Sequence, residues 1–358
     1  MSDLFSNQKI QNRKLIDLLN LNKQELRDWV AALGVATFRA AQIERWLYRE
    51  RVTDFNAMTN LPTDLRARLA TEAYIGTPRL LAEQASADGL TRKALFRLDD
   101  GETIEAVVML YPDTGRHTVC LSTQVGCPIG CPFCATGQAG YVRNLTAGEI
   151  VAQVLHFARV LQPATLTNIV LMGMGEPLLN PAVWQALDSL TDPARCGIGA
   201  RRITVSTAGV VPGIERLARE HPQINLAISL HASDDALRDV LVPLNRKYPL
   251  AEVMRAVRAH VRATRRRVTF EYALMDTVND TPEHARALVR LLRGLLCHVN
   301  LIPLNPTRAS PYRRSPTERV LAFENILREA RIPTTLRVER GIEIAAGCGQ
   351  LRQAESRR

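Results

Sequence analysis

Long apolar segments are absent from this sequence, and this absence limits where the protein can act. None of its 358 residues fall in an apolar run of about 20, the length that a membrane-spanning helix needs. The first residues carry Lys9, Arg13 and Lys14 without the apolar core of a secretory signal peptide. Internal repeats and low-complexity tracts are lacking as well. We therefore expect a cytoplasmic protein that does not bind a membrane.

Cysteine is scarce, and its distribution is uneven. The chain has seven cysteines, and three of them, Cys127, Cys131 and Cys134, fall within eight residues. A disulfide framework needs an oxidising compartment, whereas clustered cysteines in a reducing cytoplasm indicate a metal or a catalytic role. We interpret Cys196 and Cys297 as small buried apolar side chains.

Acidic residues are in the minority. The chain has 46 Lys and Arg against 36 Asp and Glu, which gives a net charge of +10. The isoelectric point is about 9.6. An excess of this size favours a polyanionic partner, with nucleic acid first among the candidates, although a solvated basic surface has the same composition.

The cysteine cluster has the spacing C-x3-C-x2-C, so that three thiolates can reach one metal centre from a single loop. An iron–sulfur cluster that is bound by protein alone takes four cysteines, and three therefore leave one iron open. A zinc site needs a fourth protein ligand, and the nearest histidines, His117 and His156, lie outside the loop. The motif resembles the signature of the radical S-adenosylmethionine (SAM) superfamily. This resemblance implies a [4Fe-4S] cluster whose open iron binds SAM and whose electron releases a 5′-deoxyadenosyl radical.

Three regions follow one another along the chain. Residues 1–85 read as a helical accessory domain, and residues 86–115 as a β-hairpin extension that turns at 99–101. Residues 116–358 alternate between strands and helices and end in a loop with a cysteine. The strands are expected at 116–122, 168–172, 202–206, 225–230, 268–274 and 298–302, with a late strand at 334–338. The helices are expected at 146–161, 181–190, 212–220, 250–264, 282–295 and 316–330. Six such units predict an α/β fold, a partial (βα)6 barrel that stays open.

Functional residues of a parallel barrel gather on the loops that follow its strands. After the second strand comes a glycine-rich turn in which Glu176 can accept a hydrogen bond from an ammonium group. The third strand ends at Ser206, a hydroxyl suited to a ribose or a carboxylate. His231, after the fourth strand, suits a ligand contact better than a structural role, and Asn305 after the sixth can bond an adenine edge or a ribose. Cys348 stands between two glycines, which suits a nucleophile that visits two places.

Five motifs occur in an order that resembles the RlmN/Cfr family of radical SAM methyltransferases. They are the cysteine motif, Gly173-Met-Gly-Glu-Pro, Ser229-Leu-His, Pro303-Leu-Asn-Pro and Cys348-Gly-Gln-Leu. The resemblance covers nearly the whole chain and is closer to the RlmN branch, which methylates C2 of an adenine in 23S rRNA and in tRNA. The Cfr branch methylates C8, and the sequence leaves this choice open.

The resemblance also implies residue roles. Cys348 would carry a methyl group from one SAM, and a second SAM would supply the radical that activates it. Cys120 would release the RNA by forming a transient disulfide with Cys348. Glu105 matches a proton acceptor, with a solvated strand residue as the equal alternative. The cofactor contacts that it implies are Gly175, Glu176, Ser206, Ser229, Leu230, His231 and Asn305. It further implies a monomer that receives electrons from a donor such as flavodoxin or ferredoxin.

Two other classes of protein fit parts of the sequence. A radical SAM activase or dehydrogenase that acts on protein would have the cysteine motif but neither Cys120 nor Cys348. A zinc-containing RNA-binding protein would lack the SAM-binding loops and would be colourless.

Overall fold

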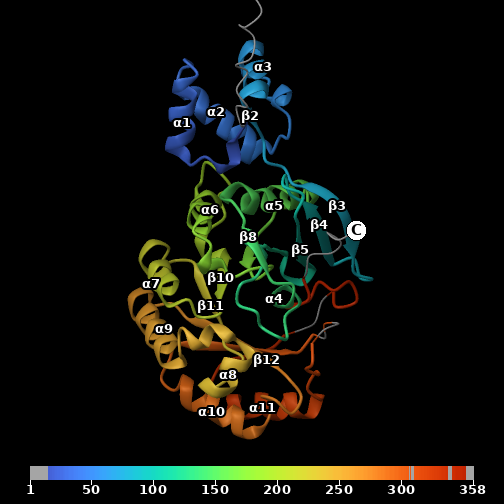
Figure 1. Ribbon diagram of the computed structural model, residues 1–358, viewed down its shortest axis with the longest axis vertical. Helices are drawn as coiled ribbons and strands as arrows, with labels where there is room; N and C mark the ends of the chain where they lie inside the picture. Colours follow the sequence, from blue (N-terminus) through green and yellow to red (C-terminus); the bar gives the residue numbers. More distant parts are fainter. Residues whose placement is uncertain (1–14, 306, 308–309, 338–340, 352–358) are drawn as a thin grey trace, which may run out of the picture.

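The computed structural model describes residues 15–305, 307, 310–337 and 341–351. The N-terminal helices form a separate layer at one end of the molecule, and the strands and helices of the barrel fill the rest (Figure 1). The late strand expected at 334–338 is observed as β14 (Thr334–Leu336), and residue 338 lies outside the described residues. No helix in the described ranges is both long and apolar enough to span a membrane.

The N-terminal unit is built from short helices whose ends are set by local chemistry. A capping box starts the first helix, because Asn22 Oδ1 accepts from the Glu25 amide and Glu25 Oε2 accepts from the Asn22 amide, at 2.9 and 2.7 Å. Two short strands pair in parallel and close the unit. The elements are α1 (Lys23–Ala32), α2 (Phe38–Arg45), a π-helix (Trp46–Glu50), α3 (Thr63–Glu72), β1 (Ile16–Asp17) and β2 (Ala73–Tyr74).

The β extension has one strand more than the expected hairpin. β4 (Thr91–Arg97) and β5 (Thr103–Tyr111) pair in antiparallel fashion around a turn in which Gly101 has a φ of +88°. β3 (Arg79–Ala85) adds a third strand at the edge of the sheet. Its side chains are mostly exposed, so the sequence lacks the alternation of apolar and polar residues that marks a half-buried strand.

The barrel forms one ten-stranded sheet with the extension, in the order β14-β13-β12-β11-β10-β9-β6-β5-β4-β3. The partial α/β barrel is confirmed, with β14 as a seventh parallel strand. Its other parallel strands are β6 (Arg116–Cys120), β9 (Asn168–Leu171), β10 (Ile203–Thr207), β11 (Asn225–Ser229), β12 (Val268–Leu274) and β13 (Cys297–Pro303). The helices between them are α5 (Ala147–Val160), α6 (Ala182–Thr191), α7 (Val211–Glu220), α8 (Asp235–Leu241), α9 (Leu250–Thr264), α10 (Pro282–Leu292) and α11 (Thr317–Glu329).

The first barrel strand is shorter than expected, because the chain changes partner before the cysteine motif. β6 ends at Cys120, and β7 (Gln124–Gly126) then pairs in antiparallel fashion with β8 (Tyr141–Asn144). This small ribbon holds both ends of the cysteine loop, and α4 (Ala135–Gln138) lies within that loop. A side chain at Gly126, where φ is +75°, would overlap the carbonyl of Gly140.

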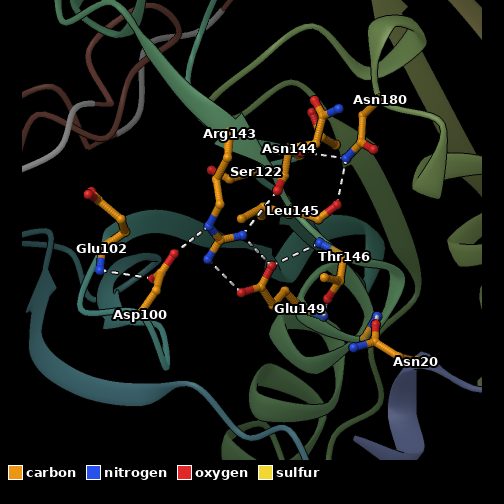
Figure 2. A network of polar contacts seen from close by, with 12 residues as sticks. Asn20, Asp100, Glu102, Ser122, Arg143, Asn144, Leu145, Thr146, Glu149 and Asn180 are labelled. Carbon is orange, nitrogen blue, oxygen red and sulfur yellow. Dashed lines mark hydrogen bonds and ion pairs between the residues drawn. The ribbon is translucent and has the colours of Figure 1, made fainter. Parts of the chain in front are cut away.

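Arg143 ties this ribbon to the start of α5 and to the hairpin of the extension (Figure 2). Two of its nitrogens donate to the two carboxylate oxygens of Glu149 at 2.8 Å each, and Nε donates to Asp100 at 2.5 Å. Glu149 also accepts from the Thr146 amide in the capping box that starts α5. The hydrogen bond from Arg143 lowers the pKa of Asp100. This network fixes the strand that closes the cysteine loop.

Candidate active site

A cavity of about 170 Å³ opens at the carboxyl ends of the barrel strands. It brings together residues from the loops after six of these strands, although the loops are distant in sequence. Ten of the predicted site residues line it: Cys127, Cys131, Cys134, Gly175, Glu176, Ser206, Ser229, His231, Asn305 and Cys348. Leu230, Cys120 and Glu105 do not line it.

The three clustered cysteines face this cavity as free thiols. Burial raises the pKa of Cys127 to about 12 and raises the pKa values of Cys131 and Cys134 in the same direction. Buried thiols of this kind lose their protons when a metal binds them. Within the described ranges no three Cys, His, Asp or Glu side chains are close enough to share one metal ion. Each cysteine of a [4Fe-4S] cluster binds a different iron, so the three thiols fit a cluster without converging on one point.

The glycine-rich turn after β9 is held against the start of the cysteine loop. The amides of Gly173 and Glu176 donate to the Leu121 carbonyl and to Gln124 Oε1, at 2.9 and 2.8 Å. Gly175 has a φ of +104°, and a Cβ there would lie 2.6 Å from that of Gln124, so only glycine fits. The approach of backbone to backbone therefore shapes this wall of the cavity.

Glu176 is buried at this wall. One carboxylate oxygen accepts from the Ala208 amide at 2.7 Å, and the other accepts from the Leu178 amide at 3.2 Å. Burial raises its pKa to about 7, while these amides oppose the shift. The carboxylate thus joins the loops after β9 and β10 and faces the cavity that both loops line.

Serine and histidine side chains form the middle of the site. The hydroxyls of Ser206 and Ser229 lie 3.3 Å apart on neighbouring strands. His231 has a positive φ of 59°, and its Nδ1 accepts from the Ala273 amide at 3.0 Å. Burial lowers the pKa of His231 to about 3, so the ring is neutral. The histidine thus supports the loop and lines the cavity at once, whereas the preceding Leu230 side chain is buried in the core.

Asn305 connects the last barrel loop to the Cys348 segment. Its Nδ2 donates to the Cys348 carbonyl at 3.1 Å, and its Oδ1 is buried without a hydrogen-bond partner among the described residues. The segment is docked against α4, because the Ala135 amide donates to the Gly349 carbonyl at 2.8 Å and Thr136 Oγ1 donates to the Leu351 carbonyl at 2.5 Å. Cys348 is half-buried in this position.

Cys120 lies beneath the cavity on β6. Burial raises its pKa to about 12, and the nearby Cys348 adds to this shift. All seven cysteines are free, so the structure has no disulfide between these two. Glu105, on the adjacent β5, is 3% exposed and forms an ion pair with Lys93 at 3.0 Å. It is therefore not the solvated strand residue that the sequence left as an alternative.

Comparisons with known proteins agree with this architecture. Residues 16–75 match the ribosomal RNA large subunit methyltransferase N-terminal domain, and residues 121–292 match the radical SAM superfamily. A probable dual-specificity RNA methyltransferase RlmN of Chloroflexus aurantiacus is 51% identical to this chain over 93% of it and 92% of the relative. The relative of the same name from Moorella thermoacetica is 50% identical over 95% of this chain and 98% of the relative. The chain belongs to the RlmN family. The crystal structure of a radical SAM methyltransferase from Sphaerobacter thermophilus superposes with a TM-score of 0.91 and 55% identity, and covers 94% of this chain and 99% of that one.

Three charged residues of this RlmN-family site were missed in the sequence. Glu271 and Arg337 line the cavity from β12 and from the end of β14. Glu271 accepts a hydrogen bond from Asn300 Nδ2 at 2.7 Å, and burial raises its pKa. The neighbouring Cys348 raises the pKa of Arg337. Arg238 on α8 is fully buried behind the Ser229–His231 loop. Alternation along β12 could have marked Glu271 as an inward-facing polar residue, but no local pattern marks the two arginines.

Proposed function

We propose that this protein methylates C2 of an adenine in RNA, both in 23S rRNA and in tRNA. One observation carries the proposal, namely that Cys348 lines the same cavity as the three cysteines of the radical SAM motif. Cys120, the other cysteine that the family resemblance assigns to catalysis, lies close enough to Cys348 for the Cys348 charge to raise the pKa of the Cys120 thiol. The relatives from Chloroflexus aurantiacus and Moorella thermoacetica bear the name probable dual-specificity RNA methyltransferase RlmN. The net charge of +10 suits an RNA substrate.

The chemistry explains why the methyl group cannot pass directly from SAM to adenine C2 by a polar reaction. Adenine C2 is the carbon of an amidine and is electrophilic, and the methyl group of SAM is electrophilic too. A polar transfer between them fails, so the methyl group must first be carried by the protein and then be converted to a radical. A bound [4Fe-4S] cluster on Cys127, Cys131 and Cys134 and two molecules of SAM in each turnover would supply the methyl group and the hydrogen-abstracting radical.

Cys348 and Cys120 divide the remaining work. The Cys348 thiolate takes a methyl group by displacement, and after hydrogen abstraction the methylene carbon bonds to adenine C2. The C2 proton is then lost, with Glu105 as the proposed acceptor, and one electron is lost, for which the bound [4Fe-4S] cluster in its oxidised state would be the acceptor, so that a thioether between protein and RNA remains. The Cys120 thiolate then attacks the Cys348 sulfur, the sulfur–carbon bond breaks, and the methylene carbon takes up a proton. The products are methylated RNA and a Cys120–Cys348 disulfide, which must be reduced before the next turnover.

The cofactor contacts remain those that the loops indicate. Glu176 would accept from the amino group of SAM, and the paired hydroxyls of Ser206 and Ser229 would bond its ribose or carboxylate. Asn305, whose buried Oδ1 lacks a partner in the described residues, would bond the adenine or the ribose. We further propose that the protein works in the cytoplasm as a monomer and receives electrons from a flavodoxin or a ferredoxin.

Mass spectrometry of nucleosides from treated RNA tests the proposal. Reconstituted enzyme with SAM and a reductant should convert adenosine in 23S rRNA and tRNA to 2-methyladenosine. The matched variants are Cys348→Ala, which should give no product, and Cys297→Ala, which alters a buried cysteine that does not line the cavity and should give the normal amount. Formation of 8-methyladenosine instead would assign the protein the C8 chemistry and contradict the C2 proposal.

A further inference from the structure

A second cavity, of about 810 Å³, lies where the N-terminal helices meet the barrel. It is bounded by the π-helix, by α5, and by the loops that lead into β9 and β10. These loops enter the strands at their amino ends, so the cavity is at the opposite end of the sheet from the site described above. The two cavities share no lining residue. We refer to the second one as the seam cavity.

Arginine side chains converge on the seam cavity. Arg49 and Arg51 line it from the N-terminal unit, and Arg202 lines it from the loop before β10. Arg159 lies next to them, because its Nη1 donates to the Arg51 carbonyl at 3.2 Å. Burial lowers the pKa of Arg159, and the charge of Arg51 adds to this shift. Among the described residues that line the cavity there is no Asp or Glu.

The carboxylates near the seam do not neutralise these arginines, because each is already paired with another cation. The pairs are Lys23–Asp192 at 2.5 Å, Arg195–Glu44 at 2.7 Å and Arg45–Glu50 at 3.3 Å. Within the described ranges, no ion pair to a carboxylate is formed by Arg49, Arg51, Arg159 or Arg202. Cations that the fold holds together without a counter-charge form a binding site for an anion.

The walls of the seam cavity give this site a definite shape. The Arg49 guanidinium donates to the Pro193 carbonyl and lies against Gly197, where an added Cβ would come within 3.1 Å of it. The buried Tyr48 ring lines the same cavity. Its hydroxyl has no hydrogen bond of normal geometry among the described residues, although Ser189 is near enough to influence it. The Tyr48 ring is already covered by the Arg195 guanidinium, whose Cζ lies 4.9 Å from the ring centroid, so the arginines that line the cavity are the groups left to bind a ligand, and they suit one that carries phosphate.

We propose that the seam cavity binds a phosphate-bearing ligand through Arg49, Arg51 and Arg202. Guanidinium groups match phosphate because their planar forks donate two parallel hydrogen bonds to it. The phosphate has two possible sources, a free nucleotide or the backbone of an RNA that reaches from the active site around the barrel. The second source rests on the function proposed above, whereas the first does not.

Isothermal titration of the full-length, cluster-reconstituted protein with inorganic pyrophosphate, ATP and a tRNA transcript tests the proposal. The test variant combines Arg49→Gln, Arg51→Gln and Arg202→Gln. The control variant removes the same charge from exposed arginines of α9 and α10, through Arg255→Gln, Arg262→Gln and Arg290→Gln. Circular dichroism and thermal unfolding check that both are folded. The single variant Arg202→Gln, which alters an exposed side chain, gives a milder version should the triple variant not fold.

Pyrophosphate should bind the native and control proteins and should bind the triple variant at least about tenfold more weakly, since several charge-assisted hydrogen bonds are lost. An RNA source predicts that the variant also binds tRNA more weakly. The slope of the logarithm of its tRNA affinity against the logarithm of salt concentration should then fall in magnitude by about one for each lost phosphate contact. A free-nucleotide source predicts weakened ATP binding with tRNA affinity equal to that of the control.

Equal binding of all three probes by the triple variant and the control would overturn the proposal. This outcome is independent of the methyl-transfer function, because pyrophosphate binding needs neither SAM nor an RNA product. Conversely, failure to find methylated adenosine would leave a positive pyrophosphate result standing and would point to the free-nucleotide source.

Discussion

Lys93 Nζ lies 3.0 Å from Glu105 Oε1 and 3.3 Å from the carbonyl oxygen of Ala345. One buried ammonium group thus joins the carboxylate proposed as a proton acceptor to the segment that carries Cys348. The Lys93 and Glu105 side chains are only 11% and 4% exposed, so the pair is protected from solvent. This contact couples the β extension to the candidate catalytic loop.

Lys93→Met should therefore cost about 3–5 kcal/mol of stability, because it removes a buried ammonium group that lies 3.0 Å from the buried Glu105 carboxylate. Adding Glu105→Gln to it should recover much of this loss, since the buried charge is then removed. Chemical denaturation of the two single variants and the double variant measures the coupling. Strictly additive effects would show that the two side chains do not interact.

Arg238 is expected to be a second determinant of stability. Its guanidinium donates to the carbonyls of Ala208, Ser229 and Leu230 and to Asn245 Oδ1, at 2.6 to 3.2 Å, and it joins the loops after β10 and β11. Arg238→Met leaves these acceptors buried without donors and should lower stability by about 3 kcal/mol. Arg255→Met, at an exposed arginine of α9, is the control and should be nearly neutral. A neutral effect of Arg238→Met would contradict this role.

Asp17 should make stability depend on pH. Burial raises its pKa from the usual 3.8 to about 6, although it accepts from the amides of Leu19 and Gly76. The folded state therefore binds the proton more tightly than the unfolded state, so this contribution is complete below about pH 4 and is lost as pH rises to 6. Its size is about 3 kcal/mol at most. Asp17→Asn should make the denaturation midpoint depend less on pH between pH 4 and 6. The same pH dependence in the variant and in the native protein would contradict the raised pKa of Asp17.

The colour of the reconstituted variants distinguishes the cysteines that bind the cluster from the other cysteines. Anaerobically reconstituted protein should be brown and should cleave SAM when reduced, and Cys127→Ala, Cys131→Ala or Cys134→Ala should abolish both properties. Cys196→Ala is the matched control, because this cysteine lines the seam cavity instead. A colourless protein that contains one zinc would refute the cluster.

Much of the architecture could be predicted because each barrel element carries its own signal. The helix expected at 146–161 and the strands expected at 268–274 and 298–302 have local patterns, and the structure has them as α5, β12 and β13. β3 was missed because its side chains are mostly exposed, and α8 because it is only seven residues long. Local patterns were thus sufficient for the long elements and insufficient for the short or solvated ones.

The site was predictable where motifs mark it and not where the fold alone brings residues together. Glu176 and Asn305 were found because each follows a strand in a distinctive loop. The contact of Lys93 with Glu105, and the convergence of arginines on the seam cavity, join segments that are distant in the sequence. Nothing in the local sequence of these residues indicates such long-range contacts.

The measurement that tests the central claim most directly is denaturing electrophoresis of Cys120→Ala after reaction with labelled RNA. This variant should keep its iron, its SAM cleavage and its methyl group on Cys348, because Cys120 acts only when the RNA is released. A covalent protein–RNA species should accumulate and should disappear on nuclease digestion, while Cys120→Ala combined with Cys348→Ala should give none. Normal turnover by Cys120→Ala, without any adduct, would contradict the account.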